Sequence, residues 1–185
     1  MRDPGAVAPL SRPVSSPIYN RSSLYHVGLW TNDHEASIRF YLEAFDGKLL
    51  TVPYELSGER AEQLYRTPGV RMLICHIEFP DGGGVELCRP LSPPREMPGR
   101  ETRNGIPLPH VGLRMKEIER AYAAVEPAGG RLLTDLITSV SPGSGRHVFY
   151  CEDPDGNVVE VVTSGFEESI ALIHAARPES VPPGT

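Results

Sequence analysis

Hydrophobic and polar positions alternate in two short segments that are nearly the same. Residues 25–30 read Tyr-His-Val-Gly-Leu-Trp, and residues 109–114 read Pro-His-Val-Gly-Leu-Arg. Side chains of a β-strand point alternately to its two faces, so His and Gly share one face while Val and Leu share the other. The recurrence predicts a chain made of two similar halves.

A helical period follows each of these segments. The apolar positions recur at i, i+3, i+4 and i+7 in both halves: Ile38, Tyr41, Leu42 and Phe45, then Ile118, Ala121, Tyr122 and Val125. This spacing gives each helix one apolar stripe that packs into a core. Asn32 followed by Glu35 predicts the first helix's N-terminal cap, and Asp46-Gly47 predicts its end.

Further strand-like segments complete each half. They cover residues 48–54, 70–79 and 84–88 in the first half, and 131–136, 146–151 and 157–162 in the second. Residues 55–67 are a polar, partly helical excursion. Each half therefore has the order strand, helix, strand, strand, strand. Two βαβββ modules predict an α+β fold, a curled, half-open cup of antiparallel sheet with its helices outside.

The repeat also predicts the domain organisation. Residues 1–22 are rich in proline without a hydrophobic period and are expected to be a flexible leader. Residues 23–165 form one domain, with module one at 23–90, a proline-rich linker at 91–108 and module two at 109–165. Residues 166–185 are expected to form a short helix and a disordered tail.

Composition excludes several classes of partner. The formal net charge is -6, which argues against nucleic-acid binding because phosphates require a basic face. Neither a signal peptide nor a membrane span is apparent, so we expect a cytoplasmic protein that acts on a small molecule and not at a membrane. The three cysteines, Cys75, Cys88 and Cys151, lie in strand-like segments without a CxxC pair and are expected to be reduced.

Four residues of metal-ligand type recur in the order His26, Glu86, His110 and Glu160. If a pseudo-twofold axis relates the halves and their first strands lie side by side, all four gather on the concave face. Buried carboxylates are costly unless a cation neutralises them, so the set predicts one divalent metal ion. Two imidazoles and two carboxylates suit Zn, Ni, Co, Mn or Fe, with positions left open for substrate oxygens.

These residues make the sequence similar to the vicinal oxygen chelate superfamily, which includes glyoxalase I, methylmalonyl-CoA epimerase, extradiol dioxygenases and the fosfomycin and bleomycin resistance proteins. The resemblance covers about residues 24–163. It rests on the two His-Val-Gly-Leu strands, the segments 37–41 and 86–90, and the segment 149–157 that precedes Glu160. It implies two βαβββ modules around a metal ion that holds substrate through neighbouring oxygens.

Within the superfamily, the position of Glu86 bears on the reaction. Glyoxalase I and the epimerases place a fourth ligand there, whereas extradiol dioxygenases and fosfomycin resistance enzymes use two histidines and one glutamate. The resemblance therefore favours a metal-dependent isomerase or lyase that activates a carbonyl compound for proton transfer, with Glu160, or else Glu86, as the base. It also favours a homodimer, whose metal site lies within one chain or between swapped halves of two.

Two alternatives remain open at this stage. The first is an Fe(II) extradiol dioxygenase acting on a catechol, with His26, His110 and Glu160 as ligands and Tyr150 orienting the substrate. The second is a small-molecule binding or resistance module without turnover. Trp30 and Arg114 take equivalent places in the two halves and are expected to contact substrate. His76 and His147 are expected to be ordinary strand histidines.

Overall fold

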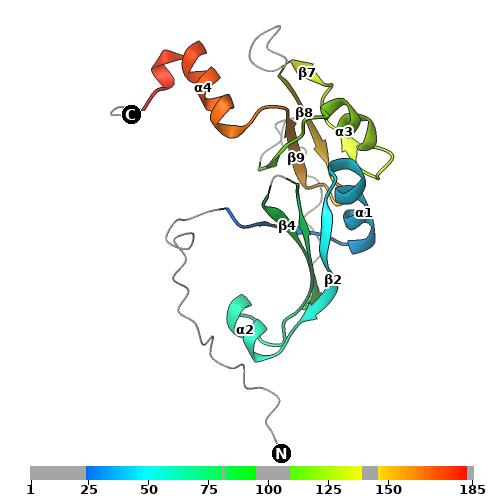
Figure 1. Ribbon diagram of the computed structural model, residues 1–185. Helices are drawn as coiled ribbons and strands as arrows, with labels where there is room; N and C mark the ends of the chain where they lie inside the picture. The colour runs from blue at the N-terminus through cyan, green and yellow to red at the C-terminus, as the bar shows by residue number, and fades with distance from the viewer. Residues whose placement is uncertain (1–23, 81, 95–108, 139–145, 183–185) are drawn as a thin grey trace, which may run out of the picture.

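The computed structural model describes residues 24–80, 82–94, 109–138 and 146–182. It confirms the predicted α+β fold of two modules, which follow one another along the chain (Figure 1). The predicted leader and residues 95–108 of the predicted linker lie outside the described residues.

Module one contains four strands and two helices. In chain order these are β1 (Val27–Trp30), α1 (His34–Phe45), β2 (Lys48–Leu56), α2 (Glu59–Tyr65), β3 (Arg71–Glu78) and β4 (Gly84–Ser92). Module two contains β5 (Val111–Arg114), α3 (Ile118–Ala124), β6 (Arg131–Leu132), β7 (Ile137–Thr138), β8 (His147–Glu152) and β9 (Val158–Val162). The chain continues into α4 (Phe166–Ala176) and the 3₁₀ turn η2 (Pro178–Ser180).

The sheets are mixed, where a purely antiparallel cup was expected. Module one has the strand order β1-β4-β3-β2 and module two has β5-β9-β8-β6, with β7 also paired to β8. The first strand of each module runs parallel to the last. Such a pair needs a long connection, which consists of α1, β2, α2 and β3 in module one and of α3, β6, β7 and β8 in module two. The two first strands, β1 and β5, lie in separate sheets and not side by side as predicted.

The cap of α1 differs from the prediction by one residue. The Asp33 carboxylate, not the Asn32 side chain, accepts the backbone N–H groups of Glu35 and Ala36, at 3.0 and 3.2 Å. Asn32 instead donates its backbone N–H and its side-chain amide to Asp155 of module two. Both residues are good caps, and the contact between modules decides which of them serves.

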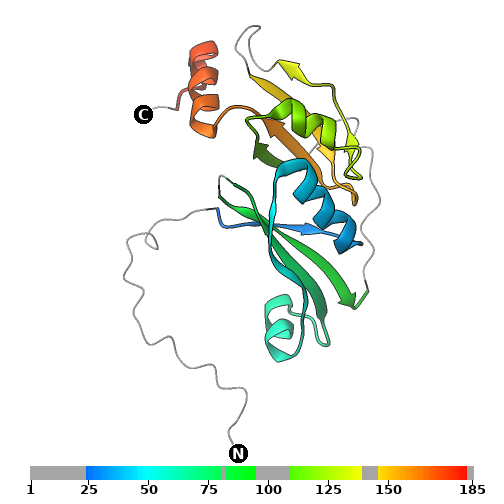
Figure 2. The ribbon, with the colours of Figure 1, turned by 45° about the vertical axis from the view of Figure 1, so that its right-hand side comes forward.

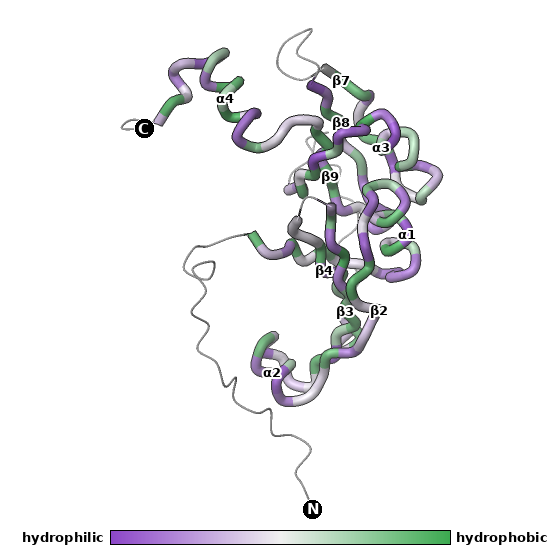
Figure 3. Tube along the Cα trace, viewed as in Figure 1, coloured by the Kyte–Doolittle hydropathy of each residue, from purple (hydrophilic) through white to green (hydrophobic). Residues whose placement is uncertain are grey.

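One core joins the two modules. The apolar faces of α1 and α3 pack into a cluster with the helix-facing side of both sheets, including Phe40, Leu87 and Phe149. The two helices lie side by side in both views (Figures 1 and 2). Hydropathy along the trace matches this packing, since hydrophobic and hydrophilic positions are interspersed along the strands (Figure 3). The modules therefore meet through their helices.

The turn before β9 fastens module two to module one. Asp155 accepts hydrogen bonds from the hydroxyls of Thr31 and Ser37, at 2.7 and 2.8 Å, in addition to those from Asn32. Asn157 donates its side-chain amide to the carbonyl oxygen of Trp30 at 2.8 Å. These bonds fix the end of β1 and the start of α1 against module two.

Helix α4 extends from the end of module two and buries none of its residues (Figures 1 and 2). Its first turn is held by the buried Arg146, which donates to the hydroxyls of Ser164 and Ser169. No helix within the described residues is both long and apolar enough to cross a membrane.

Candidate metal centre

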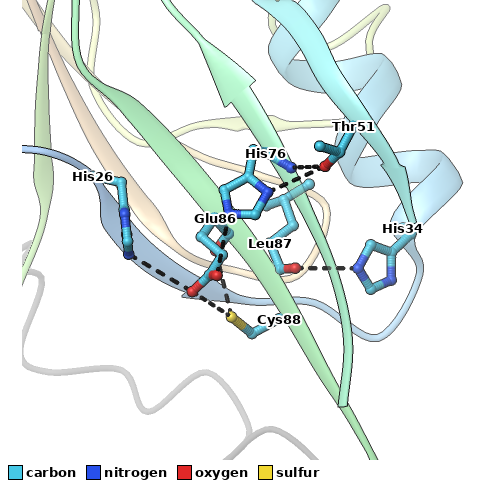
Figure 4. Close-up of polar contacts among 7 residues, drawn as sticks. All are labelled: His26, His34, Thr51, His76, Glu86, Leu87 and Cys88. Carbon is cyan, nitrogen blue, oxygen red and sulfur yellow. Dashed lines mark hydrogen bonds and ion pairs between the residues drawn. The ribbon is translucent and has the colours of Figure 1, made fainter. Parts of the chain in front are cut away.

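In module one, the carboxylate of Glu86 lies between two imidazoles (Figure 4). Its Oε2 is 3.7 Å from Nε2 of His26, and its Oε1 is 3.3 Å from Nε2 of His76. Glu86 is on β4, while His76 lies directly opposite on β3 and Gly28 directly opposite on β1. We call the side of each sheet that carries the predicted ligands the ligand face.

Thr51 on β2 contacts His76 at the other ring nitrogen. The Thr51 hydroxyl oxygen accepts the backbone N–H of His76 at 3.0 Å and lies 3.1 Å from Nδ1 of that ring. In the neutral tautomer that carries its proton on Nε2, the ring points this proton at Oε1 of Glu86, 3.3 Å away. Thr51 and Glu86 thus face the two nitrogens of one imidazole.

Module two repeats this arrangement with one change. Nε2 of His110 is 3.2 Å from Oε2 of Glu160, and the Tyr150 hydroxyl donates to Oε1 at 2.8 Å. Burial, reinforced by the bond to Glu160 and by its charge, raises the pKa of Tyr150 to about 12. Tyr150 therefore keeps its proton at neutral pH and acts as a donor, not as a base.

The two half-sites correspond atom by atom. In each module, Oε1 of the glutamate faces a polar side chain on the neighbouring strand, His76 on β3 or Tyr150 on β8, and Oε2 faces the histidine that precedes the first strand. A glycine stands opposite each glutamate. A side chain on Gly28 would meet nothing within 4 Å, and one on Gly112 would first meet Oε2 of Glu160 at 3.9 Å. The glycines leave space open beside both carboxylates.

The four predicted ligands come together as two pairs, not as one group. Within the described part of the chain, no three His, Cys, Asp or Glu side chains are placed to hold a metal ion. The cause is the packing of the modules, which share a core through their helix-facing sides and so do not bring the two ligand faces together. The four predicted ligands therefore do not gather on one concave face within a single chain.

Trp30 and Arg114 end the first strands of the two modules, on the ligand faces. Trp30 is opposite Cys88, and its buried indole N–H finds no acceptor among the described residues. Arg114 is opposite Val162, and its guanidinium is 3.5 Å from where a side chain on Gly165 would begin. The predicted substrate contacts thus border the half-sites, and Arg114 also adjoins the start of α4.

Cys88 also lies at the module-one half-site, where its thiol is 3.5 Å from Oε2 of Glu86. Burial and the nearby Glu86 charge raise the pKa of this thiol to about 12. All three cysteines are free, as expected, and Cys75 and Cys151 are buried in the core. Cys88 is therefore a protonated thiol beside the carboxylate.

Sequence reasoning missed His76. The signal was present, because His76 precedes Glu86 by the same ten positions that separate Tyr150 from Glu160.

A groove of about 620 Å³ lies away from the half-sites, between α1 and β2, with Ile38, Leu42, Pro53 and Leu73 in its lining. None of the predicted site residues lines that groove.

Comparisons with known proteins identify the class to which this fold belongs. The family model of the Glyoxalase/Bleomycin resistance protein/Dioxygenase superfamily matches residues 23–161. The chain belongs to this superfamily, which confirms the resemblance to the vicinal oxygen chelate proteins.

Individual relatives are more distant. The uncharacterized protein YwbC of Bacillus subtilis (strain 168) is 26% identical over 135 residues, which are 73% of this chain and 92% of YwbC. A glyoxalase family protein from Bacillus cereus superposes with a TM-score of 0.66 at 17% identity, over 84% of this chain and 98% of that one. The fosfomycin resistance protein FosX from Listeria monocytogenes, crystallised with Mn(II) and sulfate, gives 0.50 at 15% identity, over 81% and 98%.

Proposed function

We propose that this protein is a metal-dependent enzyme of the glyoxalase and epimerase type, which moves a proton next to a carbonyl group of a small molecule. The observation that carries the proposal is the matched pair of half-sites, each with one imidazole Nε2 facing one carboxylate Oε2. A dioxygenase triad needs only one such glutamate. The second one, Glu86, faces an imidazole Nε2 as Glu160 does, and this match supports an equal role for it as a ligand.

The complete site is proposed to form between two chains. Module one of one copy would meet module two of another, so that a homodimer holds two sites. Two observations on the single chain support this arrangement. Among the described residues the two ligand pairs do not come together, and each glutamate already has its own contacts, to His76 in module one and to Tyr150 in module two.

The donors fit a divalent ion. Two imidazoles and two carboxylates suit Zn, Ni, Co, Mn or Fe, and the ring of His26 has a buried Nδ1 without a partner among the described residues. His26 and Glu86 would hold the ion from one copy, and His110 and Glu160 from the other. When bound, the ion would supply Lewis acidity to two neighbouring substrate oxygens.

The chain's own residues would handle the proton. Glu160 is our first candidate for the base, because the Tyr150 hydroxyl at 2.8 Å and His110 at 3.2 Å hold its carboxylate in a fixed orientation. The carboxylate would take the proton from the substrate carbon and return it to the product. Glu86 is the second candidate, and Arg114 would meet an anionic substrate group.

An Fe(II) dioxygenase is the runner-up, favoured by Tyr150, which precedes Glu160 by ten positions as in dioxygenase-like members of the superfamily. In this chain the Tyr150 hydroxyl is bonded to Glu160 at 2.8 Å, where it orients a ligand. That position serves either chemistry, so the reaction itself must decide.

The deciding experiment is proton exchange without oxygen. Metal-loaded protein is incubated anaerobically in deuterated water with hemithioacetals, 2-substituted acyl-CoA thioesters and other carbonyl compounds that have an acidic α-hydrogen. We expect deuterium at the carbon next to the carbonyl, and strong impairment of this exchange by Glu160→Gln and Glu86→Gln. Turnover that requires Fe(II) and dioxygen and consumes a catechol would overturn the proposal in favour of the dioxygenase.

A further inference from the structure

A row of apolar side chains lies next to the module-one half-site, on the same ligand face. His76 on β3 and Glu86 on β4 are opposite each other. Two residues along the strands, the next pair on the same face is Ile74 opposite Cys88. Tyr54 on β2 and Trp30 on β1 extend this row to both sides. We call these four residues the apolar row. Two strand residues span about 7 Å, so the backbone of the row lies roughly that far along the strands from the backbone of Glu86 and His76.

Helix α2 closes the far side of the apolar row. Its Ala61 is fully buried in a small cluster, separate from the main core, with Val70, Met72 and Ile74. Cys88 and Leu56 pack against the same cluster. Tyr65, the last residue of α2, remains 40% exposed, and Tyr54 remains 43% exposed. Two aromatic rings thus stay accessible above a buried apolar floor.

The apolar row touches the half-site at several points. The thiol of Cys88 is 3.5 Å from Glu86, and the ring of Tyr54 stacks on that of His76, with centroids 6.2 Å apart and planes at 20°. Tyr65 ends helix α2, whose Ala61 packs in one cluster with Ile74 and Cys88 of the row. A substituent next to the metal-binding oxygens of a substrate would therefore contact the apolar row.

Module two has different chemistry at the equivalent positions. The row next to Tyr150 and Glu160 consists of Ile137, Val148, Val162 and Arg114, so an aliphatic side chain stands where module one has the Tyr54 ring and a guanidinium where it has the Trp30 indole. The aromatic side chains are gathered on the module-one side of the proposed site. The site consequently distinguishes the two ends of a substrate.

We infer that the substrate carries an apolar, preferably aromatic, group next to its vicinal oxygens, and that this group binds on the apolar row of module one. The inference rests on the proposed function, since it assumes that the half-site holds a metal ion and two substrate oxygens. It selects aryl or bulky alkyl carbonyl compounds over small polar ones. Contact of a ring with Tyr54, Tyr65 and Trp30 removes apolar surface from water and strengthens binding.

The test compares two chelators that present the same pair of oxygens, benzohydroxamate and acetohydroxamate. Both are titrated into the full-length, Co²⁺-loaded protein by calorimetry. The phenyl group should make benzohydroxamate bind about tenfold or more tightly than acetohydroxamate. Trp30 is the only tryptophan of the chain, so its fluorescence should respond to benzohydroxamate much more strongly.

Variants make the result specific to the apolar row. The double variant Tyr54→Ser, Tyr65→Ser changes one ring of the row and the exposed ring at the end of α2, and it should reduce the preference for the phenyl group to about threefold or less. Leu50→Ser changes a residue that is 52% exposed and outside the row, and it should keep the full preference. Equal binding of the two hydroxamates by the unaltered protein would overturn the inference alone. If neither bound, the proposed metal function would fail, and the inference with it.

Discussion

The hydroxyl of Tyr41, in the first helix of module one, donates a hydrogen bond to the carboxylate of Asp153 in module two, over 3.0 Å. Both groups are buried: Tyr41 is 1% exposed and Asp153 is fully buried. The bond therefore ties the core of one module to the turn that leads into the ligand strand of the other.

Removing this hydroxyl should destabilise the whole chain. We expect Tyr41→Phe to lower the free energy of unfolding by about 1–3 kcal/mol, because a buried carboxylate loses one donor. Denaturant titration followed by circular dichroism measures the change. Tyr122→Phe is a matched control, since its ring packs on Phe149 and its hydroxyl has no partner among the described residues. Equal effects of the two substitutions would contradict a specific role for the bond.

Asp153 should make stability depend on pH in a window set by its own titration. Burial, partly opposed by hydrogen bonds from Asn157 and Tyr41, raises the pKa of Asp153 from 3.8 to about 6. The folded protein thus binds a proton more tightly than the unfolded chain at this site. The stabilisation is complete below about pH 4 and is lost as the pH rises through about 6.

This contribution is isolated by comparison with Asp153→Asn. The difference in unfolding free energy, native minus variant, should decrease as the pH is raised from about 4 to about 6 and then level off. Denaturant titrations at several pH values give this difference directly. A difference that grew with pH in this range would show that the carboxyl group titrates below its usual value in the folded protein.

Mixing two inactive variants should restore metal binding if the site forms between chains. One variant carries His26→Ala and Glu86→Ala, and the other carries His110→Ala and Glu160→Ala. A mixed dimer of the two has one site with all four ligands and one with none. Random exchange of subunits should therefore recover about a quarter of the metal bound by the native protein.

The readout is metal content after co-refolding and dialysis, with each variant refolded alone as the control. Each control should retain little metal, because half of every site is missing. If the mixture held no more metal than the controls, the site would not be shared between chains. Native protein without bound divalent metal after reconstitution would contradict the metal centre itself.

His76 should support metal binding through Glu86. We expect His76→Leu to lower the affinity for Co²⁺ by about 10–100-fold, as loss of an outer hydrogen-bond donor commonly does at metal sites. His76→Gln can still donate to the carboxylate and should recover most of the affinity. The Kd and the visible spectrum of bound Co²⁺ report affinity and ligand geometry separately.

His147→Leu is the control for this series. His147 is also a strand histidine, but strand alternation places it on the opposite side of β8 from Tyr150. It should bind Co²⁺ as the native protein does. If His76→Leu did the same, the contact between His76 and Glu86 would have no part in ligand positioning.

The repeat in the sequence was sufficient to predict the two modules. Identical His-Val-Gly-Leu segments and matching helical stripes define a βαβββ unit twice, and the register Gly28 to Glu86 and Gly112 to Glu160 follows the same plan in both. What local patterns could not predict is how the modules pack. That depends on the shared core between α1 and α3 and on the bonds made by Asp155, all of which join distant parts of the chain.

The role of His76 was hidden for a related reason. The role of a histidine in a strand can be assigned only when the face it points to and its neighbours are known. The pairing of β2 with β3 shifts register on both sides of Thr51. This irregularity places Thr51 opposite His76, where it directs the ring towards Glu86. Alternation counted from the sequence alone does not reveal such a shift.

Each module has its own histidine, glycine and glutamate at equivalent positions, and this bears on how the chain could have evolved. Because one module supplies an imidazole and a carboxylate by itself, two copies of a single ancestral module would already have assembled two of each. Fusion of two such genes would then have required no new ligand. The halves now differ at His76 against Tyr150 and at Trp30 against Arg114. If the chain arose by such a duplication, these are positions where one half changed while its imidazole and carboxylate were kept.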